Sequence, residues 1–471
     1  MRRKIALMMA LVMAGMLTAC GGTKGETGQE ENRPAESVSQ EGTAADSEET
    51  AEIPAGETVE TVIWTDSTQL AEGLQAAVDL FMADNPQYQI SIESFPGSER
   101  PEKLALAKQG NSLPSLFLTA YFTSADEIHQ GTILPLTDVV NEFYAGDISD
   151  SLLNQVKIRD DYYMIPVYSS PQGMLYNADI FKAAGLEEFV TESPEEIAVW
   201  KLADLDGKIL PALKEYFGNS EKYPMALYAG SEQNDSYLIN LLWMNGGEVF
   251  KDGKCVAGED ENTIKALKKL KEWFDKGYTN SDVATRVFVD CNADFQKQNV
   301  AISAGQFATY NNHLAAFEKG DAERFDIRVA AVPREETDGT DSAAMHEYVY
   351  GFVMMNVDEA QQRAAKAFLG WLSAQEDEVL LGLSSGIPAS SRVATAQLAE
   401  NPIYQSYMDA EKYIRDFTGA VPGFVSTRAV FYPAIQSCIT GEQDEQSALE
   451  QYETQANEII KEYTDRSLVL N

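Results

Sequence analysis

The side chains of this chain that could do chemistry are mainly carboxylates and aromatic rings. It contains 74 Asp and Glu, 21 Tyr and 20 Phe residues. Its three histidines, His129, His313 and His346, and its four cysteines show no H-E-x-x-H or C-x-x-C spacing. No G-x-S-x-G motif or phosphate-binding glycine motif follows a strand-like run. These residue types predict no catalytic centre, no metal site and no cofactor, and they favour non-covalent binding.

Strands alternating with helices would have to position such binding residues. From residue 57 onward, short apolar runs alternate with amphipathic stretches, which indicates βαβ units and a largely parallel sheet. Residues 162–168 and 174–177 read as two strands joined by a kink at residues 169–173, which contain Pro171 and Gly173. A helix follows, for which Asp179 is the expected cap.

The motifs around this stretch occur in a recognisable order. Leu113-Pro114 precedes Ile165-Pro166, which is followed by Leu175-Tyr176-Asn177, Ile180-Phe181 and Gly185. This order resembles family 1 extracellular solute-binding proteins of ABC importers, which include maltose-binding proteins. Four positions depart from the family pattern, namely Ser115 in place of Asp, Asp160-Asp161 in place of Gly-Lys, and Gln298 in place of Gly.

The resemblance implies an α/β, two-lobed periplasmic-binding-protein-like fold of class II, in which each lobe is a mostly parallel sheet flanked by helices. The implied domains are lobe 1 over 57–168, lobe 2 over 169–349, a return to lobe 1 over 350–400 and C-terminal helices of lobe 2 over 401–471. Residues 162–181 would form the first hinge crossover, and the return crossing would lie near residues 348–352.

Ligands of open α/β sheets bind beyond the ends of the strands. Aromatic rings can cover the apolar faces of a sugar, and short polar side chains can bind its hydroxyls. For each aromatic residue, packing in the core is an equal alternative. Mapped onto the family pattern, the candidate ligand residues are Asp66, Ser67, Tyr121, Tyr168 and Ser170 in the first lobe and crossover, and Tyr228, Phe307, Tyr350 and Phe431 in the second lobe and return crossover.

Charge and length narrow the function classes. The 471 residues allow two or three domains, and the net charge of −38 argues against nucleic-acid binding and against capture of anionic ligands or lipids.

The first residues predict export. A basic start, Met1-Arg2-Arg3-Lys4, precedes an apolar run and Leu17-Thr18-Ala19-Cys20. This resembles the lipobox of bacterial lipoproteins, which implies a signal peptide over 1–19 and a diacylated Cys20. Residues 20–56 read as a disordered acidic tether.

The resemblance implies a binding protein rather than an enzyme. We expect a monomer that is lipid-anchored on the outer face of the bacterial cytoplasmic membrane. It would capture a carbohydrate by hinge closure, with an oligosaccharide favoured, and deliver it to an ABC transporter permease. Three alternatives remain open: a surface glycan hydrolase, a protein of the same fold that binds a polyamine or peptide, and an adhesin or sensor without transport. Neighbouring permease genes would separate the last from an importer.

Overall fold

The structure, a computed structural model, describes residues 58–398, 403–418 and 421–470. These residues belong to one compact unit that begins at Ile53. The predicted signal peptide, Cys20 and the whole of the predicted tether lie outside the described residues. Within the described part of the chain, no helix combines the length and apolarity that a membrane span requires.

Lobe 1 surrounds a core cluster drawn from residues between Val59 and Tyr168 and between Val349 and Ala389. Its strands β1, β2 and β3 pair in parallel, in the order β2-β1-β3. The elements of the first segment are β1 (Val59–Thr65), α1 (Ala71–Asp84), β2 (Tyr88–Ser94), α2 (Arg100–Gly110), β3 (Leu116–Ala120), α3 (Ala125–His129), β4 (Ile133–Leu134), α4 (Thr137–Val139), α5 (Asp150–Gln155), β5 (Lys157–Ile158) and β6 (Asp161–Tyr162). The returning segment adds α13 (Glu359–Ser373) and α14 (Asp377–Gly382). The elements that follow, β17 (Ile387–Pro388) and α15 (Ser391–Gln397), contribute Ile387 and Ala394 to the core cluster of lobe 2.

Lobe 2 surrounds a second core cluster, drawn from residues between Met174 and Ala344 and between Ile387 and Ile460. Its first segment contains α6 (Ala178–Ala183), β8 (Ile197–Ala198), α7 (Leu202–Asp204), α8 (Leu210–Phe217), β9 (Tyr223–Met225), α9 (Asp235–Leu242), β10 (Phe250–Lys251), β11 (Lys254–Cys255), α10 (Glu261–Asp275), α11 (Phe288–Gln296), β12 (Val300–Gln306), α12 (Phe307–Lys319), β13 (Ile327–Ala330), β14 (Val332–Glu335) and β15 (Asp341–Ala344). Its last segment contains α16 (Ile403–Met408), α17 (Phe424–Thr440) and α18 (Glu445–Asp465).

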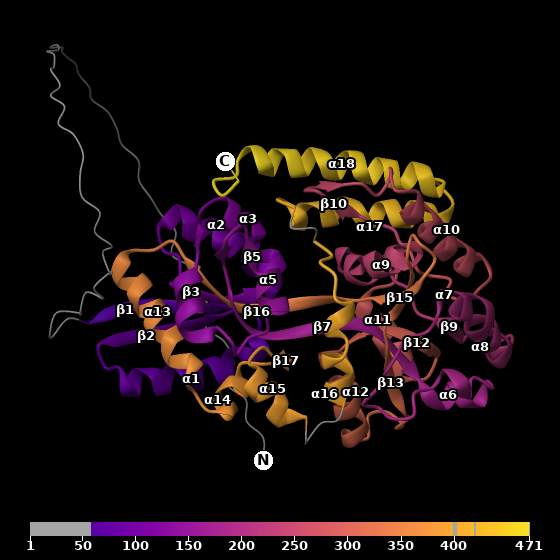
Figure 1. Ribbon diagram of the computed structural model, residues 1–471, viewed down its shortest axis with the longest axis horizontal. Coiled ribbons are helices and arrows are strands. Elements are labelled where there is room, and N and C mark those ends of the chain that lie inside the picture. The colour runs from indigo at the N-terminus through magenta and orange to yellow at the C-terminus, as the bar shows by residue number, and fades with distance from the viewer. Residues whose placement is uncertain (1–57, 399–402, 419–420, 471) are drawn as a thin grey trace, which may run out of the picture. The chain divides into compact units, whose positions relative to one another are not determined.

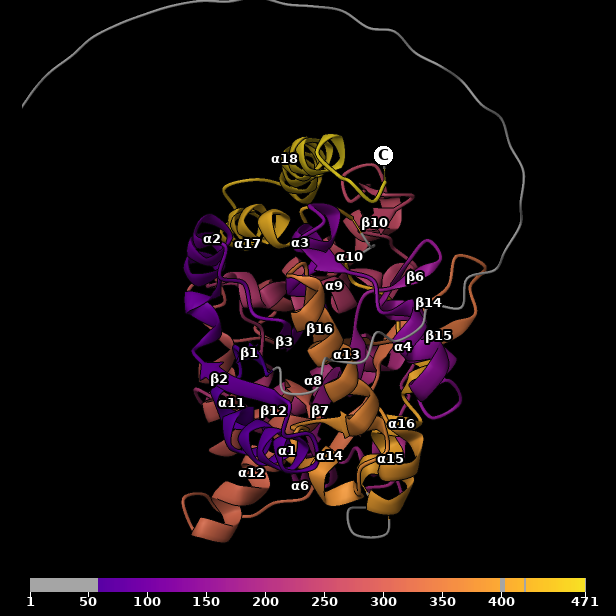
Figure 2. The ribbon, with the colours of Figure 1, turned by 90° about the vertical axis from the view of Figure 1, so that its left-hand side faces the viewer.

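Two long antiparallel strands join the lobes. They are β7 (Ile165–Asn177) and β16 (His346–Met355), and they pair with each other inside an 11-stranded sheet whose main order is β2-β1-β3-β16-β7-β12-β9. Figure 1 shows both strands between the helices of lobe 1 and those of lobe 2. In the orthogonal view of Figure 2, α17 and α18 lie on one side of these strands and α14 and α15 on the other. Within this sheet, β1 pairs in parallel with β2 and β3, β12 with β9 and β13 with β8, whereas the crossover strands pair antiparallel with their neighbours. The separate two-stranded pairs β5–β6, β10–β11 and β14–β15 are antiparallel.

The first crossover differs from its prediction. Residues 169–173 form no kink, because β7 is one continuous strand in which every residue is buried. Pro171 lies opposite Glu347 of β16, and Gly173 lies opposite Gly305 of β12. Partners from distant parts of the chain on both edges of β7 therefore hold these residues extended, although Pro and Gly locally favour a break.

The helix after β7 begins two residues earlier than predicted. Asn177 is its N-cap, and its side-chain oxygen accepts the Ile180 N–H at 3.0 Å. Asp179, the predicted cap, lies inside the first turn of α6, where its Oδ2 accepts the N–H of Asp326 at 3.0 Å. The predicted cap is therefore wrong, and Asp179 instead connects α6 to the entry of β13.

The three cysteines of the described residues, Cys255, Cys291 and Cys438, are free and buried in lobe 2. Burial raises the pKa of each thiol to about 12. These side chains therefore behave as small apolar core residues.

Candidate functional site

The lobe 1 wall of the candidate site is formed by residues that follow β1 and β3. Asp66 directly follows β1, and its Oδ2 accepts a hydrogen bond from Thr119 Oγ1 at 2.7 Å and lies 3.6 Å from Arg100 Nε. Burial raises the pKa of Asp66, while Thr119 and Arg100 oppose that shift. Ser67 is half-buried next to it, and its N–H donates to Thr65 Oγ1 at 3.2 Å.

Tyr121 and Phe122 follow β3 directly, and their rings pack toward different lobes. Tyr121 packs against the core of lobe 1, whereas Phe122 packs against the core of lobe 2. The ring of Phe122 lies 5.2 Å from that of Tyr348 and 6.1 Å from that of Phe417, measured between centroids. One turn of chain thus spans the junction between the lobes.

The crossover strands form the floor of the site. Tyr168 of β7 and Tyr350 of β16 are cross-strand neighbours whose rings stack with centroids 4.7 Å apart and planes 8° apart. Ser170 of β7 donates from Oγ to Gln306 Oε1 at 3.0 Å. Burial raises the pKa of both Tyr168 and Tyr350, and the negative charge of Asp66 raises it further.

The predicted aromatic residues of lobe 2 are placed differently. Tyr228 stacks on Tyr237 at 6.0 Å, Phe307 contacts Tyr404 at 4.4 Å, and Phe431 contacts Tyr452 at 5.1 Å, all between ring centroids. At most 2% of each predicted side chain is exposed, and all three belong to the lobe 2 core. In this conformation the structure does not bring them together with the residues of lobe 1, and their assignment as ligand residues stays a prediction.

Other lobe 2 residues face Phe122, and sequence reasoning did not select them. The Arg428 guanidinium of α17 lies 5.1 Å from the centroid of the Phe122 ring. Arg428 also forms a bidentate ion pair with Asp235 at the start of α9, with Nε–Oδ2 at 2.6 Å and Nη2–Oδ1 at 3.1 Å. Asp235 is 1% exposed; burial raises its pKa and Arg428 opposes this.

A small cavity lies between these walls, and we call it the interlobe cavity. Its volume is about 20 Å³, and it is lined by Tyr121, Phe122, Gln155, Glu347, Tyr348, Val349, Asp416, Phe417 and Thr418. Glu347 is buried on β16; burial raises its pKa, and hydrogen bonds from Gln155 and Ser169 oppose this. A volume of this size holds about one water molecule, so a larger ligand requires the lobes to separate first.

Tyr121 is the one predicted ligand residue that lines the interlobe cavity. The rule that selected it, a polar or aromatic residue at the end of a buried strand, applies equally to Phe122, the next residue. Arg428 and Phe417 carried no comparable signal, because their neighbours in space come from far away in the sequence.

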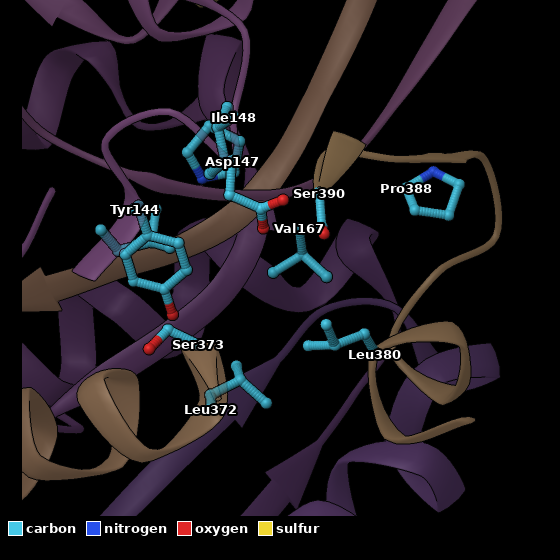
Figure 3. Close-up of a pocket in the computed structure, with 11 residues that line it drawn as sticks. Tyr144, Asp147, Ile148, Val167, Leu372, Ser373, Leu380, Pro388 and Ser390 are labelled. Carbon is cyan, nitrogen blue, oxygen red and sulfur yellow. The ribbon is translucent and has the colours of Figure 1, made fainter. Parts of the chain in front are cut away.

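A second cavity, of about 30 Å³, lies beside the crossover within lobe 1. Figure 3 shows Tyr144, Val167, Leu372 and Leu380 around it. Tyr144 Oη donates to the carbonyl of Leu369 at 2.7 Å and is thereby satisfied. None of the predicted ligand residues lines this cavity, which we interpret as a packing defect between the crossover and α13.

Metal chemistry finds no support in the geometry of the described residues, since no group of three or more His, Cys, Asp or Glu side chains is arranged to hold an ion.

Comparisons with known proteins agree on one class. Residues 64–379 match the family described as bacterial extracellular solute-binding protein. A protein of Brucella abortus (strain 2308) named as a binding protein is 22% identical over 382 residues, which cover 81% of this chain and 88% of the relative.

Solved structures share the fold at low sequence identity. The cyclic alpha-maltosyl-1,6-maltose binding protein from Arthrobacter globiformis is 19% identical with a TM-score of 0.66, covering 86% of this chain and 100% of that one. The sugar-binding protein MalE from Xanthomonas citri is 15% identical with a TM-score of 0.69, covering 86% of this chain and 98% of that one. A solute-binding protein from Thermotoga lettingae, solved with alpha-D-tagatose, is 16% identical with a TM-score of 0.66 and covers 86% of this chain and all of that one.

Proposed function

The chain belongs to the bacterial extracellular solute-binding protein family, and on that premise we propose that it binds a carbohydrate, with an oligosaccharide favoured, between its lobes. The observation that carries this proposal is that Phe122 from lobe 1 faces Tyr348 and Phe417 across the interlobe cavity, while Arg428 lies against the Phe122 ring. Aromatic faces can stack on the C–H faces of a sugar ring, and paired charged side chains can bind its hydroxyls.

Binding would proceed by hinge motion at β7 and β16. The interlobe cavity is too small for a sugar ring, so the lobes have to separate before the ligand enters and to close around it afterwards. The ligand then stabilises the closed form in proportion to its extra contacts with the second lobe. Solved proteins of the same fold support this class of ligand, because one is named as a cyclic alpha-maltosyl-1,6-maltose binding protein and another as a sugar-binding protein.

The remaining parts of the proposal concern the cell. We propose that Cys20 is acylated after cleavage of residues 1–19, that the acyl chains hold the protein at the outer face of the cytoplasmic membrane, and that residues 20–56 tether it there as a monomer. An ABC transporter permease would receive the ligand from the closed form. The lobe boundaries at residues 57, 169, 350 and 401 remain part of this proposal.

The test is a ligand screen with the purified protein. We expect at least one neutral oligosaccharide, such as maltotriose, cellotriose or xylotriose, to raise the melting temperature of the protein, because a ligand that binds only the folded state stabilises it. Calorimetry would then measure the Kd. Peptides and spermidine serve as the competing classes, and a rise with either of these but with no sugar would contradict the carbohydrate assignment.

A matched pair of variants locates the site. Phe417→Ala removes a ring that lines the interlobe cavity, whereas Phe143→Ala removes a ring that is 41% exposed and contacts Gly370 in lobe 1. We expect Phe417→Ala to weaken binding of the best sugar by about tenfold, the size of one aromatic contact. Phe143→Ala should leave the Kd unchanged, and equal effects of the two variants would place the ligand elsewhere.

A further inference from the structure

The residues that line the interlobe cavity carry a net negative charge. Two of its nine lining residues, Glu347 and Asp416, are carboxylates, and none is a lysine or arginine. Glu347 is buried on the crossover strand, and Asp416 lies at the exposed rim. Gln155 donates a hydrogen bond to Glu347 Oε1, and Asp416 Oδ1 accepts from Thr418 N at 2.8 Å.

The arginines at the lobe 1 wall and near Phe122 and Asp416 are already paired with carboxylates. Arg428 is held by both carboxylate oxygens of Asp235 and by the carbonyl of Glu232, at 3.2 Å. Arg100 lies between Asp66 and Glu127, and Arg415, next to Asp416, pairs with Glu248. The positive charge of each of these guanidinium groups is therefore balanced by a carboxylate of the protein itself.

An anionic ligand that took the place of Asp235 at Arg428 would leave that carboxylate, which is 1% exposed, buried without its partner, and this is strongly unfavourable. A ligand that left the pair intact would instead bring its negative charge toward Glu347 and Asp416 in a partly desolvated space, where like charges repel more strongly than in water. The net charge of −38 also repels anionic ligands over longer distances.

Resting on the function proposed above, we propose that the site selects sugars without a negative charge and rejects uronic-acid and sulfated sugars. Sugar hydroxyls are donors, and the oxygens of Glu347 and Asp416 can accept from them, so the groups that repel a carboxylate favour a neutral polyol. The selectivity is electrostatic and does not depend on the size of the ligand.

The experiment compares sugars of nearly equal shape and different charge. Trigalacturonate, its fully methyl-esterified form and the neutral trisaccharides of the first screen are titrated at pH 8 and low salt. We expect trigalacturonate to bind at least about tenfold more weakly than the tightest neutral trisaccharide. We expect this difference in Kd between the two sugars to become smaller at high salt, because salt screens charges and leaves steric exclusion unchanged.

Two isosteric variants assign the effect to residues. Glu347→Gln and Asp416→Asn each remove one negative charge. We expect each variant to reduce the ratio of the Kd of trigalacturonate to the Kd of the neutral trisaccharide by roughly threefold or more. Asp409→Asn is the matched control, because Asp409 is exposed and lies outside the cavity lining, where it accepts from Gln405. That control should leave the ratio unchanged.

The outcomes separate the two proposals. Binding of trigalacturonate as tight as that of the neutral sugars, or a ratio that salt and both variants leave unchanged, would overturn the charge selectivity while leaving carbohydrate binding in place. If no sugar of either charge binds, the proposed function itself fails, and the selectivity fails with it.

Discussion

At the scale of single residues, His346 shows how burial in the crossover fixes a protonation state. The ring is fully buried, and the Asn240 side-chain N–H donates to its Nδ1 at 3.0 Å, so Nδ1 carries no proton. Burial lowers the pKa of His346 to about 3. In the unfolded chain the pKa of histidine is near 6.5.

This difference makes the stability of the protein depend on pH. Between about pH 6.5 and pH 3 the unfolded chain binds the proton and the folded protein does not, so the contribution of His346 is complete above pH 6.5 and is lost as the pH falls. We predict that wild type loses about 2 kcal/mol of unfolding free energy between pH 7 and pH 5 that His346→Asn does not lose. Urea unfolding of both proteins at the two pH values measures this difference; the same loss in both would refute it.

The candidate ligand residues could be predicted only in part, because a strand end and a core position look alike in sequence. Asp66 and Tyr121 follow β1 and β3, and Tyr168 and Tyr350 lie on the crossover strands, because these strands have recognisable patterns in sequence; the role of these residues in ligand binding stays a prediction. The core position of Phe431 depends on Tyr452 of the next helix. Nothing local in its own segment distinguishes that packing from an open cleft.

At the scale of elements, the contact between β7 and β16 leaves no room for an extra methyl group. The register shifts between Tyr350 and Gly351, and Gly351 lies opposite Pro166. A Cβ atom on Gly351 would lie 2.1 Å from the carbonyl oxygen of Ile165, which is rigid backbone. The glycine is therefore required for close approach of the two crossover strands.

We predict that Gly351→Ala lowers the free energy of unfolding by about 2–4 kcal/mol, the range for a forced backbone shift in a packed region. Gly207→Ala is the control, because a Cβ there meets nothing within 4 Å. It should leave stability unchanged or raise it by a few tenths of a kcal/mol, since alanine restricts the unfolded chain. Equilibrium urea unfolding tests both, and a neutral Gly351→Ala would mean that the crossover strands can separate locally.

The elements themselves were largely predictable, and the first crossover shows where prediction failed. Alternating apolar residues identified the strand on each side of residues 169–173. The pairing that removes the expected kink comes from β16, which begins at His346, and from β12, which begins at Val300. A local pattern cannot report partners that lie so far along the chain.

At the scale of the whole molecule, a short segment after α18 connects the lobes a further time. We call residues 467–470 the strap. α18 packs into the lobe 2 core, whereas in the strap Leu468 N–H donates to the carbonyl of His129 at 2.7 Å and Ser467 Oγ lies 2.9 Å from His129 Nδ1. His129 ends α3 of lobe 1, and Figure 1 shows α18 passing toward that helix.

We predict that replacing the strap with a Gly-Ser sequence favours the open form. Without those hydrogen bonds the closed lobes lose contacts that do not depend on ligand, so the closed fraction falls and the apparent affinity falls with it, by roughly threefold or more. Small-angle scattering should show a larger radius of gyration without ligand. In the control, Gly and Ser replace Asp252 and Gly253 in the turn between β10 and β11. If the strap variant scattered identically to wild type, the prediction would be contradicted.

The two crossover strands also determine when each lobe can be completed during synthesis. β3 ends at Ala120, but its neighbour β16 begins only at His346, so one edge of the lobe 1 sheet stays unpaired until most of the chain has been made. Lobe 2 likewise waits for α17 and α18, which contribute Phe431 and Leu449 to its core. The lobe 1 core therefore cannot close before β16 and α13 have been made, and the lobe 2 core cannot close before α17 and α18 have been made, so the apolar faces of both remain available to chaperones during most of synthesis.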